Sequence, residues 1–296
     1  MRIYEHTIEC LRAQTIAGNI EIVIVAPSKG LIELDDSKLS CFHSWKVIEI
    51  GKVKSMGSAN AAGVLQASAP IIALTEDHSY VQKDWAELFV NRHREGWAAV
   101  GPSMRNGNPA DLIGWADFLQ AYVEWMEPAV CSPVRHLPGH NSSYNRNMLL
   151  NFGAELETLM EAESILHGRL KKLGHALYLD SGVCTTHLNF NTWSAYMPCR
   201  YYTGRQFAGT WSRRWRWYRR ALFAMASPGI PFLRLRNILM SARKKKPGLF
   251  LLRVFPVIFV GLVWESLGHF MGYLCGYGDS LEKVAQYEFN RTSFLQ

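Results

Sequence analysis

Residues 57–78 read GSANAAGVLQASAPIIALTEDH, and this stretch decides the fold. Its first half, residues 58–69, is rich in alanine and glycine and predicts a helix that packs closely on a sheet. Its second half, residues 70–74, is a short apolar run that predicts a buried strand. The strand ends in three potential metal ligands, Glu76, Asp77 and His78. The stretch therefore predicts a helix and a strand that lead into a polar site.

The rest of the first 180 residues repeats this alternation of strand and helix. Further strands are predicted at 20–25, 45–50, 98–100, 140–144 and 176–179, and further helices at 5–14, 85–94, 111–125, from residue 145, and at 165–173. This order predicts an α/β fold with a mainly parallel, doubly wound sheet and helices on both faces. Ligands of such sheets bind at the carboxyl ends of strands, where the polar clusters at 76–78 and 139–141 are expected.

The first polar cluster has ligand types that suit a divalent cation. An ion that bridges a diphosphate needs one or two protein ligands, because water and phosphate oxygens fill the other positions. Imidazole is a softer ligand than carboxylate, so His78 favours manganese over magnesium. The alternative is that Asp77 and His78 only cap a turn.

Residues 57–78 resemble a segment of the family 2 glycosyltransferases. In that family a helix with residues matching Gly57, Asn60 and Gly63 leads into a strand that bears an Asp-x-Asp metal motif. Glu76 and His78 stand in place of the two aspartates, and an Asp-x-His variant is known in the polypeptide N-acetylgalactosaminyltransferases. The resemblance implies a GT-A fold, a nucleotide-sugar donor, bound Mn²⁺ or Mg²⁺ and an inverting displacement, with Gly57, Asn60 and Asp77 at the donor.

A second match is PGHNSSYNR at residues 138–146, which is similar to the family pattern G-x-N-x-x-x-x-R. The resemblance puts Gly139, Asn141 and Arg146 at the donor or the acceptor. A glycine allows a sugar to approach the backbone, and an asparagine offers a donor and an acceptor to hydroxyl groups. Asn145 is either a ligand or the N-cap of the next helix. Arg146 pairs either with a phosphate or with a neighbouring glutamate.

A third match is LMEAESILHGRLKKLG at residues 159–174. Alignment on the Arg-Leu pair and the closing glycine places Glu163 on the family's catalytic base, which removes the proton of the acceptor hydroxyl. Ala162 falls where the family has a glutamate, and Glu161 is the candidate to replace it. The alternative is that both glutamates are solvated residues of a first helical turn. His187 matches a histidine that reaches the metal or the diphosphate, or else it only packs.

The charge distribution predicts a second segment with a different partner. Residues 181–264 contain fourteen Lys or Arg and no Asp or Glu, although the whole chain has 25 acidic residues. This indicates an anionic partner, either lipid headgroups or nucleic acid. Tryptophans lie among the arginines at 211–220, and an apolar run follows at 254–264, which favours a membrane. No nucleic acid is expected as a partner.

We therefore expect a glycosyltransferase domain at 1–207 and a mostly helical, basic and aromatic extension at 208–296. The apolar run is shorter than the roughly 20 residues that a spanning helix needs. An interfacial or re-entrant helix is predicted instead, with the protein peripheral or monotopic at the cytoplasmic face of a membrane. The cysteines are widely spaced and the first residues lack a signal-peptide pattern, which also favours the cytoplasm. A glycan or lipid-linked acceptor is expected.

Two further expectations come from departures from the family. The substitutions at the metal motif and at Ala162 leave open a non-catalytic protein that binds a nucleotide-sugar or glycan at a membrane. The family also has a strand before its first helix, whereas this sequence starts close to that helix. A missing central strand would leave unpaired backbone groups beside residues 20–25. We therefore expect about 15–20 residues upstream in the native protein, enough for a strand and its turn.

Overall fold

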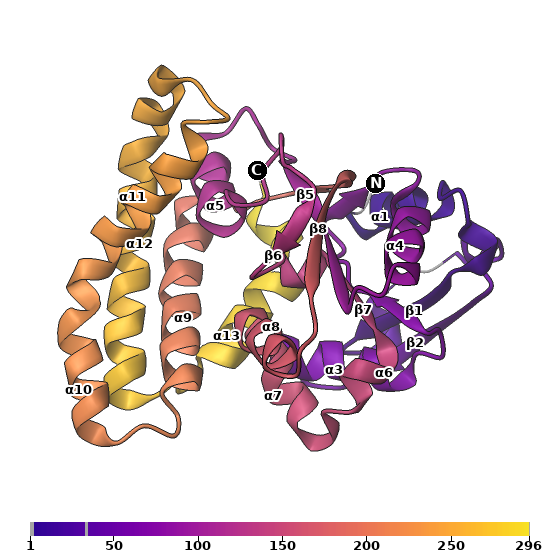
Figure 1. The fold of residues 1–296 in the computed structure, drawn as a ribbon, viewed down its shortest axis with the longest axis horizontal. Coiled ribbons are helices and arrows are strands. Elements are labelled where there is room, and N and C mark those ends of the chain that lie inside the picture. Colours follow the sequence, from indigo (N-terminus) through magenta and orange to yellow (C-terminus); the bar gives the residue numbers. More distant parts are fainter. Residues whose placement is uncertain (1–2, 33–34, 296) are drawn as a thin grey trace. The chain divides into compact units, whose positions relative to one another are not determined.

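The chain folds into two compact units in a computed structural model that describes residues 3–32 and 35–295. Figure 1 shows the strands with their helices and, separately, a group of long helices. Unit 1 consists of Met1–Arg105 and Glu127–His187, and unit 2 consists of Asn106–Met126 and Leu188–Gln296.

Unit 1 has the alternation of helices and strands that the sequence predicts. Its strands are β1 (Glu21–Ala26), β2 (Ser44–Glu49), β3 (Ile71–Ala73), β4 (Ser79–Val81), β5 (Ala99–Asn106), β6 (Ser132–Val134), β7 (Ser143–Asn145) and β8 (Leu177–His187). Its α-helices are α1 (Ile3–Arg12), α2 (Asp36–Leu39), α3 (Met56–Gln66), α4 (Trp85–Arg94), α6 (Arg146–Leu150), α7 (Leu156–Met160) and α8 (Glu163–Lys172). The mixed α/β character is therefore confirmed, although β4, β6, α2 and α7 were not predicted and the helix predicted at 111–125 belongs to unit 2.

The direction of the strands differs from the predicted mainly parallel sheet. β1 and β2 pair in parallel and form a two-stranded sheet. The other six strands form a second sheet, in which β3–β7, β5–β7, β4–β8 and β6–β8 all pair antiparallel. Alternation in the sequence predicts parallel strands only where a helix crosses over between neighbours in the sheet. These antiparallel partners are far apart in the sequence, so the alternation does not fix their direction.

The small sheet contains β1, which covers most of the apolar run at residues 20–25. Among the described residues β2 is the only strand that pairs with β1. Most residues of β1 are only partly buried, although the strand is strongly apolar.

The apolar core of unit 1 joins helices to the larger sheet. Trp85 and Phe89 of α4 are almost fully buried and contact aliphatic residues from the strands. The core residues are Leu11, Leu39, Phe42, Val81, Trp85, Phe89, Val100 and Val183. This packing holds β4 and β8, which supply the metal-binding candidates described below.

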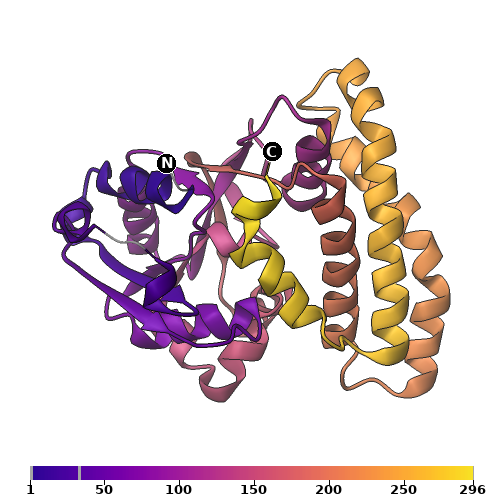
Figure 2. The same cartoon turned by 180° about the vertical axis from the view of Figure 1, so that it is seen from behind.

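Unit 2 is entirely helical apart from its connections. Its α-helices are α5 (Leu112–Tyr122), α9 (Trp193–Trp211), α10 (Trp217–Ala226), α11 (Ile230–Ala242), α12 (Gly248–Cys275) and α13 (Ser280–Phe289). α9 continues through residues 207 and 208, where the sequence predicts a domain boundary. The observed division lies instead after His187, because α9 packs along α12 and α13 within unit 2. Figure 2 shows α13 beside α9 from the opposite side.

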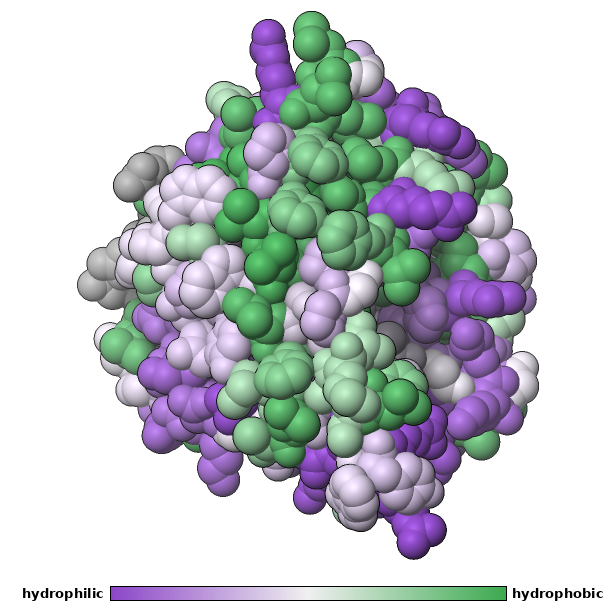
Figure 3. Space-filling model, turned by 90° about the vertical axis from the view of Figure 1, so that its left-hand side faces the viewer, coloured by the Kyte–Doolittle hydropathy of each residue, from purple (hydrophilic) through white to green (hydrophobic). Residues whose placement is uncertain are grey.

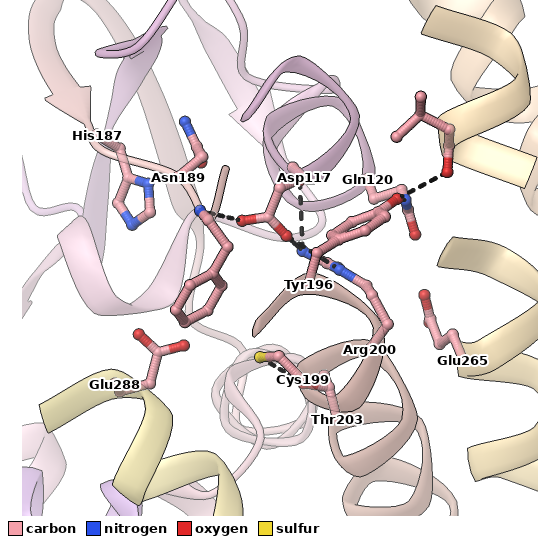
Figure 4. Close-up of polar contacts among 12 residues, drawn as sticks. Asp117, Gln120, His187, Asn189, Tyr196, Cys199, Arg200, Thr203, Glu265 and Glu288 are labelled. Carbon is pink, nitrogen blue, oxygen red and sulfur yellow. Dashed lines mark hydrogen bonds and ion pairs between the residues drawn. The ribbon is translucent and has the colours of Figure 1, made fainter. Parts of the chain in front are cut away.

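A buried ion pair holds α5 in unit 2, although α5 precedes more than a third of unit 1 in the sequence. Asp117 of α5 accepts a hydrogen bond of 3.1 Å from Nε of Arg200 in α9, and another from the backbone N–H of Phe190. Figure 4 shows this carboxylate beside Arg200. A buried charge is tolerated only when it is paired and hydrogen-bonded, so the pair explains why residues 106–126 belong to the helical unit.

Glycines allow α9 and α12 to pack with their backbones in close contact. A Cβ atom at Gly268 would overlap the carbonyl oxygen of Tyr201, and one at Gly272 would lie 2.5 Å from the carbonyl oxygen of Arg205. These neighbours are backbone atoms, so they cannot move aside as a flexible side chain would.

We expect Gly268→Val to destabilise unit 2 by about 1–3 kcal/mol, the usual cost of overpacking. Gly248→Ala is the control in the same helix, since a Cβ there has no neighbour within 4 Å. It should leave stability nearly unchanged. Urea unfolding followed by helical circular dichroism measures both variants, and equal midpoints would contradict the close packing.

The helix α12 is longer than the predicted apolar run at 254–264. Its 28 residues include Arg253 and Glu265, which we expected to bound the run. Glu265 does not end the helix because its carboxylate is buried and forms an ion pair with Arg234 of α11. Within the described part of the chain, α12 is the one helix long and apolar enough to cross a membrane, with a mean hydropathy of 1.9 over its best window. Length and composition alone do not distinguish a crossing from an interfacial position.

Candidate metal and sugar-transfer site

The strand pairing of unit 1 brings together three residues that the sequence predicts as metal ligands. Glu76 and His78 lie in the turn between β3 and β4. β4 pairs with the end of β8, and in this register Ser79 lies opposite His187. His187 is therefore next to His78, although 109 residues separate them.

The ligand atoms of these residues converge. One atom from each of Glu76, His78 and His187 lies within 4.8 Å of the others. The Nε2 atoms of His78 and His187 are 3.2 Å apart, and the Glu76 oxygens are 3.7 Å from Nε2 of His78 and 3.4 Å from Nε2 of His187. Two ligands that are each about 2.1 Å from a shared ion lie about 3.0–3.4 Å from one another at the usual coordination angles. Two of the three observed spacings fall in this range and the third, at 3.7 Å, is slightly longer, so the cluster is close to the geometry of a single first-row metal site.

The surroundings of the three residues also suit a bound ion. Both histidines are buried, with only 2% of each residue exposed. Nδ1 of His78 lies 2.8 Å from Oδ1 of Asp77. A carboxylate that holds the far nitrogen of a histidine fixes the ring and its tautomer, as it commonly does behind metal ligands. Asp77 is thus placed to position His78 and is itself partly exposed.

A neighbouring asparagine has a buried oxygen that no described residue satisfies. Asn141 donates a hydrogen bond of 3.1 Å from Nδ2 to Oε2 of Glu76, while its Oδ1 is buried without a partner. Buried polar atoms without partners are uncommon and indicate a missing water, ion or ligand. The donor set and this atom together fit a metal ion or a polar ligand at Glu76, His78 and His187.

The electrostatics keep the acidic ligand ionised. Burial by itself would raise the pKa of Glu76, but the adjacent His78 and His187 hold it well below its usual value. A carboxylate must be deprotonated to bind a cation. Glu76 is therefore in the form that metal binding requires.

The candidate base lies against the second predicted motif. Glu163 begins α8, and a Cβ atom at Gly139 would overlap its side chain. Its carboxylate also forms an ion-pair contact with Nε2 of His140. The sequence assigns Gly139 to the approach of a sugar, whereas in the structure this glycine leaves room for Glu163. Burial would raise the pKa of Glu163, but His140 lowers it below the usual value.

The second glutamate has different neighbours. A Cβ atom at Gly57 would lie 2.6 Å from Cδ of Glu161, at the start of α3. Burial raises the pKa of Glu161, while hydrogen bonds from Ser55 and the Gly57 N–H oppose that rise. Gly57 is thus in contact with a protein carboxylate at the position where the resemblance implies a donor. The structure separates the two glutamates by environment: Glu161 faces α3 and Glu163 faces residues 139–140.

The remaining candidates lie around the same residues. Nδ2 of Asn60 in α3 lies 3.4 Å from Nδ1 of His140. Asn145 is the N-cap of α6, since its side chain accepts a hydrogen bond from the N–H of Met148. Arg146 forms no ion pair with any described residue, and its Nε is buried without a hydrogen-bond partner. Of the two alternatives for Arg146, the neighbouring glutamate is therefore not its partner.

Residues 139–141 connect the metal-binding candidates to the candidate base. Asn141 is bonded to Glu76, and His140 contacts Glu163. His140 is a site residue that the sequence reasoning missed. It lies inside the second motif, but the motif gave no reason to expect contact with a residue of α8.

Among the solved structures that this chain resembles is one distant glycosyltransferase. No protein-family profile matches the chain, and no curated protein matches it in sequence. The crystal structure of S. aureus TarS, a glycosyltransferase, matches with a TM-score of 0.42 and 12% identity. The match covers 92% of this chain and 52% of TarS, so the chain spans about half the length of that protein. The functional case therefore depends on the residues of unit 1.

Proposed function

We propose that the protein is a glycosyltransferase that moves a sugar from a nucleotide-diphosphate sugar to an acceptor hydroxyl. The observation that carries the proposal is that the segment 139–141 contacts two groups. Asn141 donates a hydrogen bond to Glu76 of the Glu-His-His cluster, and His140 pairs with the carboxylate of Glu163. Transfer needs both: charge stabilisation at a leaving diphosphate and a base at the attacking hydroxyl. In support of the proposal, the Glu-His-His cluster and the Glu163 carboxylate both lie next to residues 139–141.

In the proposed reaction Glu163 accepts the proton of the acceptor hydroxyl. The acceptor oxygen forms a bond to C1 of the sugar as the bond from C1 to the diphosphate oxygen breaks. A single displacement of this kind inverts the configuration at C1. A divalent ion held by Glu76, His78 and His187 would supply positive charge at the leaving diphosphate. Arg146 is available for a phosphate, and Asn60 and Asp77 lie beside His140 and His78.

The two imidazole ligands favour one metal ion over another. Magnesium prefers oxygen ligands and resists losing its water, whereas imidazole suits first-row transition metals. Manganese is the proposed ion for this site, with magnesium as the weaker alternative.

We also propose that unit 2 attaches the enzyme to the cytoplasmic face of a membrane rich in anionic lipid. Residues 181–264 supply fourteen positive charges and no negative ones. A glycan or lipid-linked acceptor would then be presented at the membrane surface.

The proposal predicts metal-dependent turnover of a nucleotide-sugar by the purified chain. UDP-, GDP- and TDP-sugars are tested with Mn²⁺ for thermal stabilisation and for release of the nucleoside diphosphate. We expect at least one donor to stabilise the protein and to be hydrolysed slowly, with both effects lost in chelator. Stabilisation without turnover, even with candidate acceptors, would favour the alternative of a non-catalytic nucleotide-sugar or glycan binding protein. That alternative is kept because Glu76 and His78 depart from the family's metal motif and Ala162 replaces the glutamate that precedes the base in the family.

A further inference from the structure

One face of unit 2 is unusually apolar for a surface. Large apolar side chains of α10, α11 and α12 are exposed there, with Leu252 72% exposed and Trp217 80% exposed. Figure 3 looks on to the side formed by these helices and shows a broad hydrophobic band with hydrophilic residues at its margins. The most exposed aliphatic and aromatic members include Leu222, Met225, Phe232, Leu233, Leu249 and Leu252. A contiguous apolar surface of this kind marks a contact with a membrane or a protein.

The exposed residues follow one stripe along α12. Leu249 and Leu252 lie near the start of the helix, and Leu267, Phe270 and Leu274 lie near its end. Within each group the residues are three or four positions apart, and the 15 positions between Leu252 and Leu267 are close to four full helical turns. Such spacing places side chains on the same side of a helix. The stripe therefore runs along almost the full length of α12 and leaves the other side for packing.

The other side of α12 is packed within unit 2, where most of its buried residues are apolar or glycine and a few are polar. Glu265, Ser266 and His269 are buried there, and Glu265 pairs with Arg234. Figure 4 shows Glu265 among the polar residues inside this unit. The packed side of α12 is thus occupied within unit 2, and the exposed apolar stripe is the side that remains for a membrane.

Basic residues lie at both ends of the apolar face. Arg213, Arg214 and Arg216 are exposed just before α10, and Arg243 and Lys244 are exposed just after α11. Arg219 lies over the ring of Trp215, at 3.9 Å from its centroid. Indole rings and arginines together favour the headgroup region, and the charges complement anionic lipid. The chemistry of these margins selects a lipid surface over an apolar protein partner.

Exposed polar residues within the face argue against a crossing by α12. Arg236 and Asn237 are exposed in the middle of α11, which packs against α12. α9 lies along α12 on its other side and carries Arg200 and Arg205. If α12 crossed the bilayer, these neighbours would enter the hydrocarbon with it, where charged side chains are costly.

From these observations we propose that α10, α11 and α12 form a monotopic docking face that lies flat in the interface of an anionic membrane. Leu222, Phe232 and Leu252 enter the outer acyl region, while the arginines at both ends remain among the headgroups. This docking face rests on the proposed membrane attachment of unit 2, and it specifies which residues of unit 2 contact the membrane and how the helices are oriented there. It is independent of sugar transfer by unit 1.

The test is vesicle flotation of the full chain with the double variant Phe232→Glu/Leu252→Glu. The matched control is Leu65→Glu, a similarly exposed leucine of unit 1. We expect binding to vesicles of phosphatidylcholine mixed with phosphatidylglycerol, weaker binding in high salt, and at least a tenfold loss of binding in the double variant only. Bromines placed shallow in the acyl chains should quench tryptophan fluorescence more than bromines placed deep.

Three results would overturn the docking face. One is unchanged vesicle binding by the double variant. Another is equal binding to pure phosphatidylcholine in high salt with stronger quenching by the deep bromines, which indicates a crossing helix. The last is a dimer that the double variant converts to a monomer while vesicle binding persists, because the face then binds a second copy.

Nucleotide-sugar stabilisation measured on the same samples shows whether unit 1 is intact, so failure of the docking face is distinguishable from failure of the transferase proposal.

Discussion

Replacing Glu163 by glutamine is expected to lower the rate of sugar transfer by about 10²–10⁴-fold, the usual cost of losing a general base. Donor binding should change by no more than a few-fold, because glutamine keeps the size and polarity of the side chain. His140 keeps the pKa of Glu163 low, so the carboxylate is ionised near neutral pH. Transfer is measured with a saturating donor, and donor binding is measured separately by calorimetry.

The matched control is Glu161→Gln, two residues earlier in the chain. Glu161 contacts the start of α3 at Ser55 and Gly57, away from residues 139–140. We expect this variant to keep its activity and to lose some stability. If Glu163→Gln retains more than about a tenth of the wild-type rate, Glu163 is not the base. A large loss in Glu161→Gln alone would move the role to that residue.

His140 gives the same prediction a second readout. This histidine lowers the pKa of Glu163, so the carboxyl group of a His140→Gln variant should have a higher pKa. Activity that needs the ionised carboxylate is lost as the pH falls through this pKa. The acidic limb of the pH profile of kcat is therefore expected to move to higher pH in His140→Gln. A profile that falls in height without moving would indicate a role in packing only.

The sequence singled out the metal-binding candidates because they follow strand ends. Glu76 and His78 come directly after a buried strand, and His187 ends the last strand of unit 1. The sequence could not supply the pairing of β4 with β8 that brings His187 to His78. Only the resemblance to a family connected these residues across 109 positions.

The strand direction, the environments of the two glutamates and the length of α12 depend on tertiary contacts, which a local sequence pattern does not predict. The direction of β7 between its two neighbours is not encoded by the alternation of helices and strands. The distinct environments of Glu161 and Glu163 arise from the bend between α7 and α8, and both look alike in sequence. The full length of α12 was missed because Glu265 resembles the end of an apolar run until its partner Arg234 is known.

Removing one imidazole from the candidate metal cluster is expected to weaken Mn²⁺ binding by more than about 100-fold. Loss of a residue that only holds a ligand in place usually weakens metal binding by about 10–100-fold, and loss of the ligand itself should weaken it more. His78→Ala and His187→Ala should behave alike, since both supply Nε2 to the same point. Titration of Mn²⁺ followed by electron paramagnetic resonance measures binding directly and needs no turnover. His43→Ala, a substitution of an exposed histidine in the same unit, is the control and should bind Mn²⁺ as the wild type does.

A graded result would separate a metal centre from a purely structural cluster. Asp77 contacts His78 but is not one of the proposed metal ligands. We therefore expect Asp77→Asn to weaken Mn²⁺ binding by only about 10–100-fold. Glu76→Gln should lose binding as fully as the histidine variants, because a neutral amide replaces the one anionic ligand. If the four variants instead lose thermal stability while Mn²⁺ affinity is unchanged, the cluster only packs unit 1. The diphosphate would then have to be stabilised by Arg146 and the other cationic groups of the protein.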